Sequence, residues 1–433
     1  MKESPTRLKK RSEILDVLFV STTQFDGGAS IAAYRLFCGI RELGLSCKFQ
    51  SFVRQTDDPD VIGPSEGSTR ARIYRFFSKV EQLSIRKYRG ALRTPFSAAD
   101  RRNPFRPRYE NVKTRVLHFH WVAKSTLDLR HVPPSTPIIW TLHDAWMFTG
   151  GCHYTQDCVR YQESCGKCPQ LGSQLATDLS QISWDFKKRT IAAMNLIVVT
   201  PSNWLASQAR QSLMLKGKEV VVIPNGIDTK IFSPRERLQS CLTLDLDPSL
   251  PVILFGAQSV NDRRKGTDLL IDALELLDFK CTALTFGTGI LPSIKNDLVQ
   301  VRNLGPITDE NQLPILYSAA DVFVCPSRED NLPNTVMEAM SCGTPVVAFD
   351  SHGLPDLVDH KKNGYLCRPF DSQELAQGIT EILKGLSSYD LGNVARAKVQ
   401  EIYDLEVVSR QYKKLYERII LMYPQDNPPT YNP

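Results

Sequence analysis

Short apolar segments alternate with helical patterns along most of the chain. In the first half the strand-like segments are ILDVLFVS, SCKFQSFV, RVLHFHW, PIIWTLHD and LIVVTPS, and the helical segment ASIAAYRLFCGIRELGL follows the first of them. In the second half VVVIPNGID, PVILFGA, CTALTFGTG, DVFVCPS and TPVVAFD alternate with the helical segments TDLLIDALELL and NQLPILYSAA. Strands and amphipathic helices in alternation are typical of doubly wound parallel sheets, so the sequence predicts an α/β protein.

The strand–helix pattern begins twice, and the segment IPNGID marks the point where it restarts. A chain of 433 residues is also too long for one ordinary core. We therefore expect two Rossmann-like domains facing each other across a cleft, at residues 1–224 and 225–404. A long amphipathic helix is predicted at 405–422. The Pro/Asn-rich residues 423–433 are predicted to form a disordered tail.

The composition is that of a globular protein, with 42% hydrophobic and 23% charged residues. No apolar run approaches the length of a membrane span, and the first residues lead into a strand without a signal-peptide core. These features predict a cytoplasmic protein. Seven of the eleven cysteines are scattered in mostly apolar surroundings, and we expect them to be buried free thiols.

Positive charge is concentrated between residues 70 and 108, where twelve Lys/Arg accompany two Asp/Glu. Tyr, Phe and Leu residues are interleaved with these basic groups. A basic amphipathic segment of this kind suits the surface of an anionic membrane, and the alternative is a solvated insertion in the N-terminal domain. Nucleic acid is not expected as a partner, because nothing else in the chain matches a nucleic-acid-binding module.

Several turns that follow apolar strands carry residues suited to ligand binding, since ligands of such sheets bind beyond the carboxyl ends of the strands. The turn GTGILP lacks the third glycine of a dinucleotide fingerprint, and no phosphate-binding P-loop motif is present. Two glycine-rich turns precede helices, FDGGAS with Gly28 and DRRKGTDLL with Arg264 and Lys265. Such turns let a phosphate approach the backbone, although each one alone also fits a simple turn with surface charge.

The segment CPSREDNLPNTVMEAMSCGTPVV, residues 325–347, combines a loop with a short helix. The helix is expected to begin near Asn334 or Thr335, residue types that cap N-termini, and to end at Gly343. Free N–H groups of its first turn suit a diphosphate, while Asp330 and Glu338 on either side suit hydroxyl groups. A nucleotide-sugar has this distribution of charge and hydroxyls.

Three motifs together resemble the retaining glycosyltransferase family 4, which has the GT-B fold. VIPNGIDTKIF, residues 222–232, resembles the family's domain junction, DRRKGTDLL its donor-diphosphate turn, and residues 330–338 its E-x7-E motif. The resemblance extends from Val17 to about Tyr416. It implies that the helix at 405–422 crosses back onto the N-terminal domain.

By this resemblance the chain transfers a hexose from a nucleotide-diphosphate sugar to a glycan or lipid-linked oligosaccharide, without a metal ion or other catalytic cofactor. Glu338 would bind the ribose and Asp330 the donor sugar, Lys265 would contact the diphosphate with Gly28 beside it, and His143 would lie by the transferred sugar. The expected catalytic residues are His143, Asp330 and Lys265. The expected donor-binding residues are Gly28, Arg264, Lys265, Asp330, Asn331, Leu332, Pro333, Asn334 and Glu338.

The chain departs from the family pattern at two positions. The first acid of the motif is Asp330, one methylene shorter than Glu, and Ser259 stands where the family usually has an arginine. Arg264 is a candidate to supply that missing charge. For His143 the alternative to a functional role is a core histidine with backbone partners, and for His118 and His120 packing is the favoured interpretation.

The remaining four cysteines, Cys152, Cys158, Cys165 and Cys168, are separated by five, six and two residues. They suit a closed tetrahedral Zn²⁺ site, and a reducing compartment favours a metal over disulfides. The alternative is a cysteine-rich loop without a ligand. The loop resembles the branch of the family used in bacterial surface-polysaccharide synthesis, of the colanic-acid type, and we expect it to shape the acceptor side.

Other functions remain open from the sequence. The order of the motifs disfavours an epimerase or an inverting transferase. A non-catalytic subunit that binds a sugar nucleotide or glycan is the main alternative, because Ser259 departs from the family pattern. A metalloenzyme built on the four cysteines is a more distant one.

Overall fold

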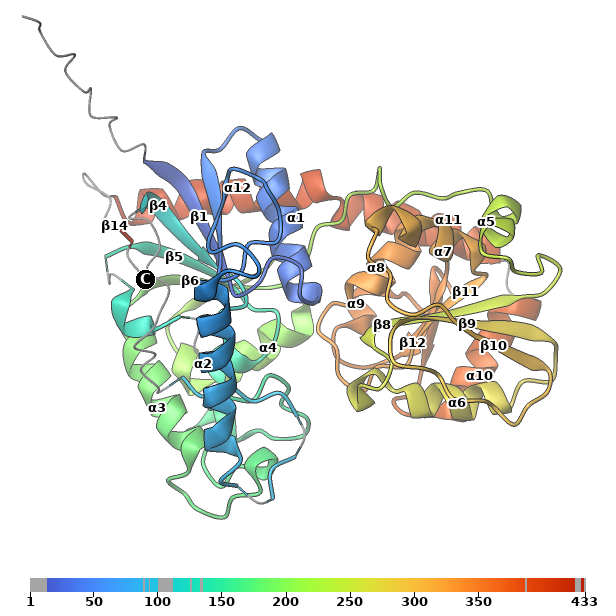
Figure 1. The fold of residues 1–433 in the computed structure, drawn as a ribbon, viewed down its shortest axis with the longest axis horizontal. Helices are drawn as coiled ribbons and strands as arrows, with labels where there is room; N and C mark the ends of the chain where they lie inside the picture. The colour runs from blue at the N-terminus through green and yellow to red at the C-terminus, as the bar shows by residue number, and fades with distance from the viewer. Residues whose placement is uncertain are drawn as a thin grey trace, which may run out of the picture.

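Two α/β lobes make up the computed structural model of the chain, each a parallel sheet with helices on both faces (Figure 1). This arrangement confirms the predicted fold class of two Rossmann-like domains. The structure describes residues 14–88, 90–92, 94–99, 112–124, 127–132, 135–385, 388–424 and 430–431.

The N-terminal lobe is built on a sheet with the order β3-β2-β1-β4-β5-β6-β7, all parallel, with β14 antiparallel to β4. Its strands are β1 (Leu15–Ser21), β2 (Cys47–Ser51), β3 (Val61–Ile62), β4 (Val112–Phe119), β5 (Pro137–Thr141), β6 (Asn195–Thr200) and β7 (Glu219–Val222). Its helices are α1 (Gly28–Glu42), α2 (Thr69–Ile85), α3 (Leu179–Ala192) and α4 (Asn203–Gln211).

The C-terminal lobe contains a six-stranded sheet with the order β10-β9-β8-β11-β12-β13. Its strands are β8 (Val252–Ser259), β9 (Cys281–Thr288), β10 (Val299–Asn303), β11 (Val322–Cys325), β12 (Val346–Phe349) and β13 (Gly364–Cys367). Its helices are α5 (Arg237–Thr243), α6 (Thr267–Glu275), α7 (Leu313–Ala319), α8 (Asn334–Ser341), α9 (Leu354–Leu357), α10 (Ser372–Thr380) and α11 (Ser388–Lys398).

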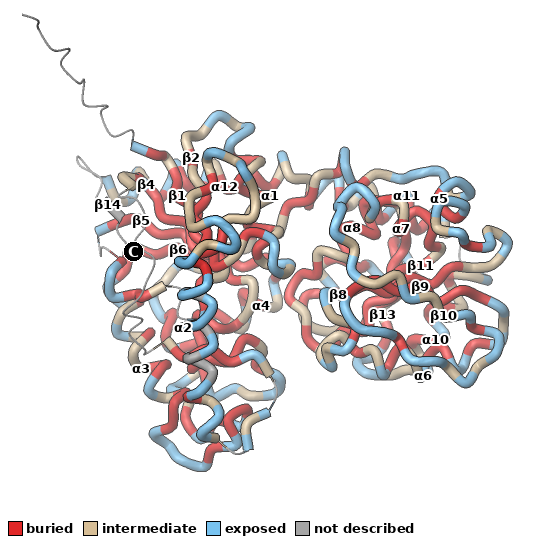
Figure 2. Tube along the Cα trace, in the orientation of Figure 1, coloured by how far each residue is buried: buried red, intermediate tan, exposed pale blue. Residues whose placement is uncertain are grey.

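The apolar runs in the strands follow from burial of both faces of each sheet. In β1, Val17 and Phe19 pack in the cluster that contains residues of α1, whereas Leu18 and Val20 pack in a cluster on the opposite face. The tube view shows the buried segments gathered on the strands of both lobes (Figure 2). The sheets therefore hold the loops at their strand ends in fixed positions.

The last helix, α12 (Leu405–Met422), crosses to the N-terminal lobe and packs beside α1 (Figure 1). Its apolar face, which includes Val408, Tyr412 and Ile419, is buried in the same cluster as Phe19. A side chain at Gly39 of α1 would collide with Ser409 of α12, so glycine permits this close crossing. The chain thus passes between the lobes twice.

The two crossing segments are hydrogen-bonded to each other. The amide of Ile227 donates to the carbonyl of Tyr403 at 2.9 Å, and the amide of Leu405 donates to the carbonyl of Ile227 at 2.8 Å. The Thr229 hydroxyl donates to Asp404 at 2.6 Å. These bonds join the two connections into one crossing point between the lobes.

The prediction of a disordered tail is wrong for residues 430 and 431. Strand β14 (Thr430–Tyr431) pairs antiparallel with β4, with Thr430 opposite Lys113 and Tyr431 opposite Val112. A backbone pairing of two residues with the start of β4 needs no apolar pattern, which is why the Pro/Asn-rich composition did not indicate it. Residues 425–429, 432 and 433 lie outside the described part of the chain.

The basic segment 70–108 begins with helix α2, and residues 89, 93 and 100–108 of it lie outside the described residues. Among the described side chains of α2, Ile73 and Phe76 are exposed. Across the described part of the chain, every helix is either too short or too polar to cross a bilayer.

Candidate functional site

A cavity of about 900 Å³ lies between the two lobes, within the size range typical of ligand sites. From the N-terminal lobe it is lined by the loop before α1, helix α2, and the loops after β4 and β5. From the C-terminal lobe it is lined by the end of β8, the turn before α6, and residues 330–335. Most of these segments follow the carboxyl ends of parallel strands, as expected for open α/β sheets.

Two cations and one carboxylate meet on the C-terminal wall of the cavity. The ammonium of Lys265 donates to Asp330 Oδ2 at 2.6 Å, and Arg264 Nη1 lies 3.3 Å from the same oxygen. Burial alone would raise the pKa of Asp330, but Lys265 and Arg264 lower it below the usual value for an aspartate. Among the described residues, the hydrogen bonds to this carboxylate all reach Oδ2.

Gly266 fixes the position of this pair of cations. Its φ of 72° is in the left-handed region, and an added Cβ would collide with the carbonyl oxygen of Pro326. Glycine thus lets the Arg264–Lys265 turn lie directly against the loop that carries Asp330. Ser259 lies at the end of β8, and Arg264 places a guanidinium in the cavity that this serine cannot supply.

Helix α8 begins at Asn334, as predicted, with its N-terminus at the cavity wall. The capping residue is Pro333, not Asn334 or Thr335 as expected, and no side chain caps the helix. The Asn334 side chain instead donates to the carbonyl of Gly28 in the other lobe at 3.0 Å. The first-turn N–H groups of α8 are therefore free of side-chain acceptors, which suits an anion.

Glu338 lies one turn farther along α8 and is almost fully buried. Its Oε1 accepts from Arg35 Nη2 of α1 at 2.9 Å, and its Oε2 accepts from the Tyr317 hydroxyl at 2.8 Å. Arg35 also pairs with Glu310. Glu338 is not among the described residues that line the cavity. Its carboxylate lies behind the cavity wall and forms an ion pair with Arg35 of the other lobe.

His143 follows β5 and lines the cavity on the N-terminal wall. Its Nε2 lies 3.0 Å from Nδ1 of His120, and burial lowers the pKa of His143 to about 4. The imidazole is therefore neutral at neutral pH. Deeper in the lobe, His118 lies between the Tyr416 hydroxyl and the Thr141 hydroxyl, at 2.7 and 2.8 Å, which agrees with the packing interpretation of that residue.

Beside His143, Asp144 forms a second polar cluster on the same wall. Its Oδ2 lies 2.6 Å from His153 Nδ1 and accepts from the indole N–H of Trp121 at 2.8 Å. His153 Nε2 lies 3.1 Å from the Ser97 hydroxyl. Burial raises the pKa of Asp144, but His153 and the other donors outweigh it and lower the pKa below its usual value. The sequence gave no sign that Asp144 and His153 are partners.

Further contacts tie the two walls together. The Asn331 amide donates to the carbonyls of Leu142 and His143, at 3.3 and 3.2 Å, so this predicted donor-binding residue also holds the lobes together. The Glu329 carboxylate accepts from the amides of Thr155 and Gln156, at 3.0 and 2.9 Å. These contacts were not predicted, because they join residues far apart in the sequence.

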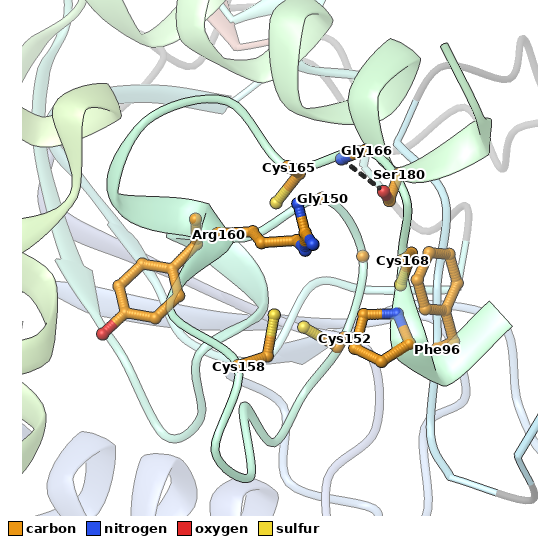
Figure 3. Close-up of a pocket in the computed structure, with 12 residues that line it drawn as sticks. Phe96, Gly150, Cys152, Cys158, Arg160, Cys165, Gly166, Cys168 and Ser180 are labelled. Carbon is orange, nitrogen blue, oxygen red and sulfur yellow. Dashed lines mark hydrogen bonds between the residues drawn. The ribbon is translucent and has the colours of Figure 1, made fainter. Parts of the chain in front are cut away.

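The loop between β5 and α3 contains the four clustered cysteines and also reaches the opposite lobe. Tyr154, which lies between the first two cysteines, places its ring 4.4 Å from the guanidinium carbon of Arg264. The cysteines themselves line a separate small cavity (Figure 3). As the side chains of the described residues are placed, no three metal-ligating groups are close enough together to hold an ion.

The predicted donor-site residues are thus mostly brought together. Apart from Glu338, all of them and His143 line the same cavity. The residues that sequence reasoning missed are Arg35, Glu329, Tyr154 and His153. Of these, Arg35 alone had a local signal, as a charged residue within the mainly apolar pattern of α1.

Comparison with known proteins agrees with the two-lobe arrangement. Residues 49–231 match the family model described as Glycosyltransferase Family 4, and residues 250–385 match the model described as Glycosyl transferases group 1. The chain is 26% identical over 333 residues to the putative colanic acid biosynthesis glycosyl transferase WcaC of Escherichia coli K12, covering 70% of this chain and 76% of that protein.

Solved structures of GT-B glycosyltransferases share the fold. Sucrose-phosphate synthase from Thermosynechococcus elongatus superposes with a TM-score of 0.65 at 20% identity, covering 94% of this chain and 100% of that one. Anabaena HepE in complex with UDP-glucose superposes with a TM-score of 0.59 at 18% identity, covering 93% of this chain and 100% of that one.

Proposed function

We propose that this glycosyltransferase, with a family 4 N-terminal half and a group 1 C-terminal half, transfers a hexose from a nucleotide-diphosphate sugar with retention of configuration. The acceptor is a glycan or lipid-linked oligosaccharide in polysaccharide biosynthesis. The observation that carries the proposal is the C-terminal wall of the cavity, where Lys265 and Arg264 lie beside the uncapped N-terminus of α8.

The diphosphate is proposed to lie between the Lys265 ammonium and the first-turn N–H groups of α8, with Gly28 close by. Helix N-termini and fixed cations both favour a dianionic group. Asp330 holds the cations in place through Oδ2, and its Oδ1 is assigned to hydroxyl groups of the donor sugar. The HepE complex with UDP-glucose supports a donor of this class by analogy of fold.

Glu338 is proposed to bind the ribose hydroxyls of the donor. Its carboxylate is held by Arg35 and Tyr317, at 2.9 and 2.8 Å, so donor binding would exchange one of these contacts for a ribose hydroxyl. Because Arg35 belongs to the N-terminal lobe, that exchange would link donor binding to the relative position of the lobes.

During transfer the bond from the anomeric carbon to the diphosphate breaks, and a bond to the acceptor oxygen forms on the same face of the sugar. The departing diphosphate gains negative charge, which Lys265, Arg264 and the α8 N-terminus stabilise without reorganising. The acceptor proton leaves with the departing phosphate oxygen. His143, neutral and placed on the facing wall, is assigned to orient the sugar and acceptor.

The basic helix α2 supports a peripheral contact with an anionic membrane. Arg70 and Arg72 are exposed beside the exposed apolar side chains of Ile73 and Phe76. Arg75 and Lys79 of the same helix line the cavity, so a membrane-bound acceptor would reach the site along it. Flotation with anionic and neutral vesicles tests this contact, and equal binding to both would contradict it.

The function is tested by incubating the chain with UDP-, GDP- and dTDP-hexoses without acceptor. A competent transferase slowly hydrolyses its donor, and proton NMR of the first sugar released shows whether the anomeric configuration is retained. Binding of a donor without any hydrolysis, in the presence or absence of acceptor glycans, would instead favour the non-catalytic binding subunit.

A further inference from the structure

The four clustered cysteines converge on one small cavity in the loop between β5 and α3. Cys152, Cys158, Cys165 and Cys168 all line it, and Figure 3 shows their side chains on different sides of the space. Cys152 and Cys168 are buried, and the other two are partly buried. All four are free thiols. Residues separated by as many as sixteen positions thus share one small cavity, whose described lining also includes Arg160 but no His, Asp or Glu.

The backbone around the last two cysteines forms a tight left-handed turn. Cys165, Gly166 and Lys167 have φ values of 58°, 88° and 44°. Side chains of the following segment fix this turn: the amide of Gly166 donates to the Ser180 hydroxyl at 3.0 Å, and the amide of Cys168 donates to Asp178 at 2.8 Å. A knuckle with two residues between cysteines is a familiar half of structural zinc sites.

A buried lysine of α3 packs against the same loop. Lys187 of α3 is fully buried, and its ammonium lies 4.4 Å from the centre of the Trp146 ring and donates to the Trp146 carbonyl. No ion pair within 4.0 Å is formed by Lys187 with a carboxylate among the described residues. Four thiolates around Zn²⁺ would carry a double negative charge, which would favour a buried ammonium packed on the same loop.

We propose that Cys152, Cys158, Cys165 and Cys168 bind one structural Zn²⁺ ion, with Lys187 as a buried counter-charge. The sulfur atoms must move together to do so, and each thiol reaches other positions by rotation about its Cα–Cβ bond. Four thiolate ligands close the coordination of the metal, so the ion takes no part in transfer.

The metal would also brace the cavity between the lobes. The segment between Cys152 and Cys158 carries Tyr154 to Arg264, and the amides of Thr155 and Gln156 to Glu329. Fixing both ends of this segment at one ion restricts it in the position where it makes these contacts. The inference concerns metal binding and loop order, and it stands whether or not the proposed donor is correct.

The first test is the zinc content of the full-length chain after loading with Zn²⁺ under reducing conditions and gel filtration. We expect about one ion per chain in the wild type. The Cys165→Ser/Cys168→Ser variant should hold little or none, and Cys38→Ser, a matched partly buried cysteine outside the cluster, should hold as much as the wild type. A wild-type chain without zinc, or equal loss in both variants, would overturn the proposal.

If the double variant does not fold, the wild-type chain provides the same information. Modification of its thiols with a mercurial should release the zinc, detected with a colorimetric indicator. Substitution with Co²⁺ should give thiolate charge-transfer absorption and the spectrum of tetrahedral cobalt. Bound zinc that survives thiol modification, or a cobalt spectrum without thiolate absorption, would rule out these ligands.

Hydrogen exchange of the Thr155 and Gln156 amides tests whether zinc holds this segment against the C-terminal lobe. Removal of zinc should lower their protection, while the amides of β8 in the C-terminal lobe stay unchanged and serve as the control. Protection that does not depend on zinc would overturn the bracing role.

Discussion

The two walls of the cavity are built in different ways. The C-terminal wall comes mainly from two short stretches, 264–265 and 330–335, and its two cations, Arg264 and Lys265, are adjacent in sequence. The N-terminal wall combines the loop before α1, helix α2, residues 95–97, and the loops after β4 and β5, the second of which contains the clustered cysteines. A wall made from local motifs suits one fixed task, such as the proposed binding of a diphosphate, whereas a wall made from separate loops can vary with the acceptor.

The largest effect on turnover is expected on the C-terminal wall. Lys265→Ala removes the ammonium that lies 2.6 Å from Asp330. Loss of one preorganised charge at a departing group lowers the rate by about 10²- to 10³-fold, or about 3–4 kcal/mol. Steady-state kinetics with the best donor measures this. Arg263→Ala, an exposed neighbour outside the cavity, should remain near wild type, and equal losses in the two variants would contradict the assignment.

The ion pair that joins the walls is expected to stabilise the fold. Glu338→Ala leaves the buried Arg35 with Glu310 as its one remaining ion-pair partner among the described residues, which should lower the free energy of unfolding by about 3 kcal/mol. Glu310→Ala removes a half-exposed carboxylate and should cost less than about 1 kcal/mol. Urea unfolding compares the free energies of the two variants. A larger loss in Glu310→Ala than in Glu338→Ala would contradict the conclusion that Glu338 is the main partner of Arg35.

The N-terminal wall should make stability depend on pH. Burial lowers the pKa of His143 to about 4, and those of His118 and His120 also lie well below 6.5. Between about pH 6.5 and 4 the unfolded chain binds protons that the folded chain does not, so stability is complete above this window and falls as the pH drops through it. His143→Gln should reduce the slope by at most about 1.4 kcal/mol per pH unit.

This slope is measured by urea unfolding at several pH values. The wild-type chain, unfolded under the same conditions, provides the reference slope. An unchanged slope in His143→Gln would mean that this imidazole is not held neutral in the folded chain.

The smallest effect on donor binding is expected where the cysteine-containing loop contacts the Arg264–Lys265 turn. Tyr154→Ala removes the ring that lies 4.4 Å from Arg264, worth about 0.5–1 kcal/mol, and should weaken donor binding several-fold. Tyr154→Phe keeps the ring and should bind donor like the wild type. Calorimetric titration with the donor distinguishes them, and equal weakening in both would assign the effect to the hydroxyl group.

The sequence allowed the fold class and most of the C-terminal wall to be predicted. Alternating apolar strands and amphipathic helices specify two parallel sheets, and the glycine and the cations of one turn lie within three adjacent residues. Helix α12 matches its predicted range because its apolar face keeps a helical period over the whole segment. Such features depend on neighbours in the chain, so local patterns reveal them.

The remaining site contacts depend on how the lobes meet. Arg35 and Glu338 are 303 residues apart, and Glu329 reaches amides about 174 residues away. No pattern in either segment specifies its partner, and the pairing follows only from the crossing of the chain at residues 227 and 404–405. The prediction that Asn334 caps helix α8 was wrong for the same reason, since the Asn334 side chain donates to the carbonyl of Gly28 in the other lobe.

Donor-dependent thermal stabilisation of the wild-type chain and the Lys265→Ala variant tests the central claim most directly. A ligand that binds only the folded state raises the melting temperature by mass action. We predict that at least one nucleotide-sugar from a UDP, GDP and dTDP panel stabilises the wild type and has little effect on the variant. A panel that stabilises neither protein, or both equally, would contradict a diphosphate bound between Lys265 and the start of helix α8.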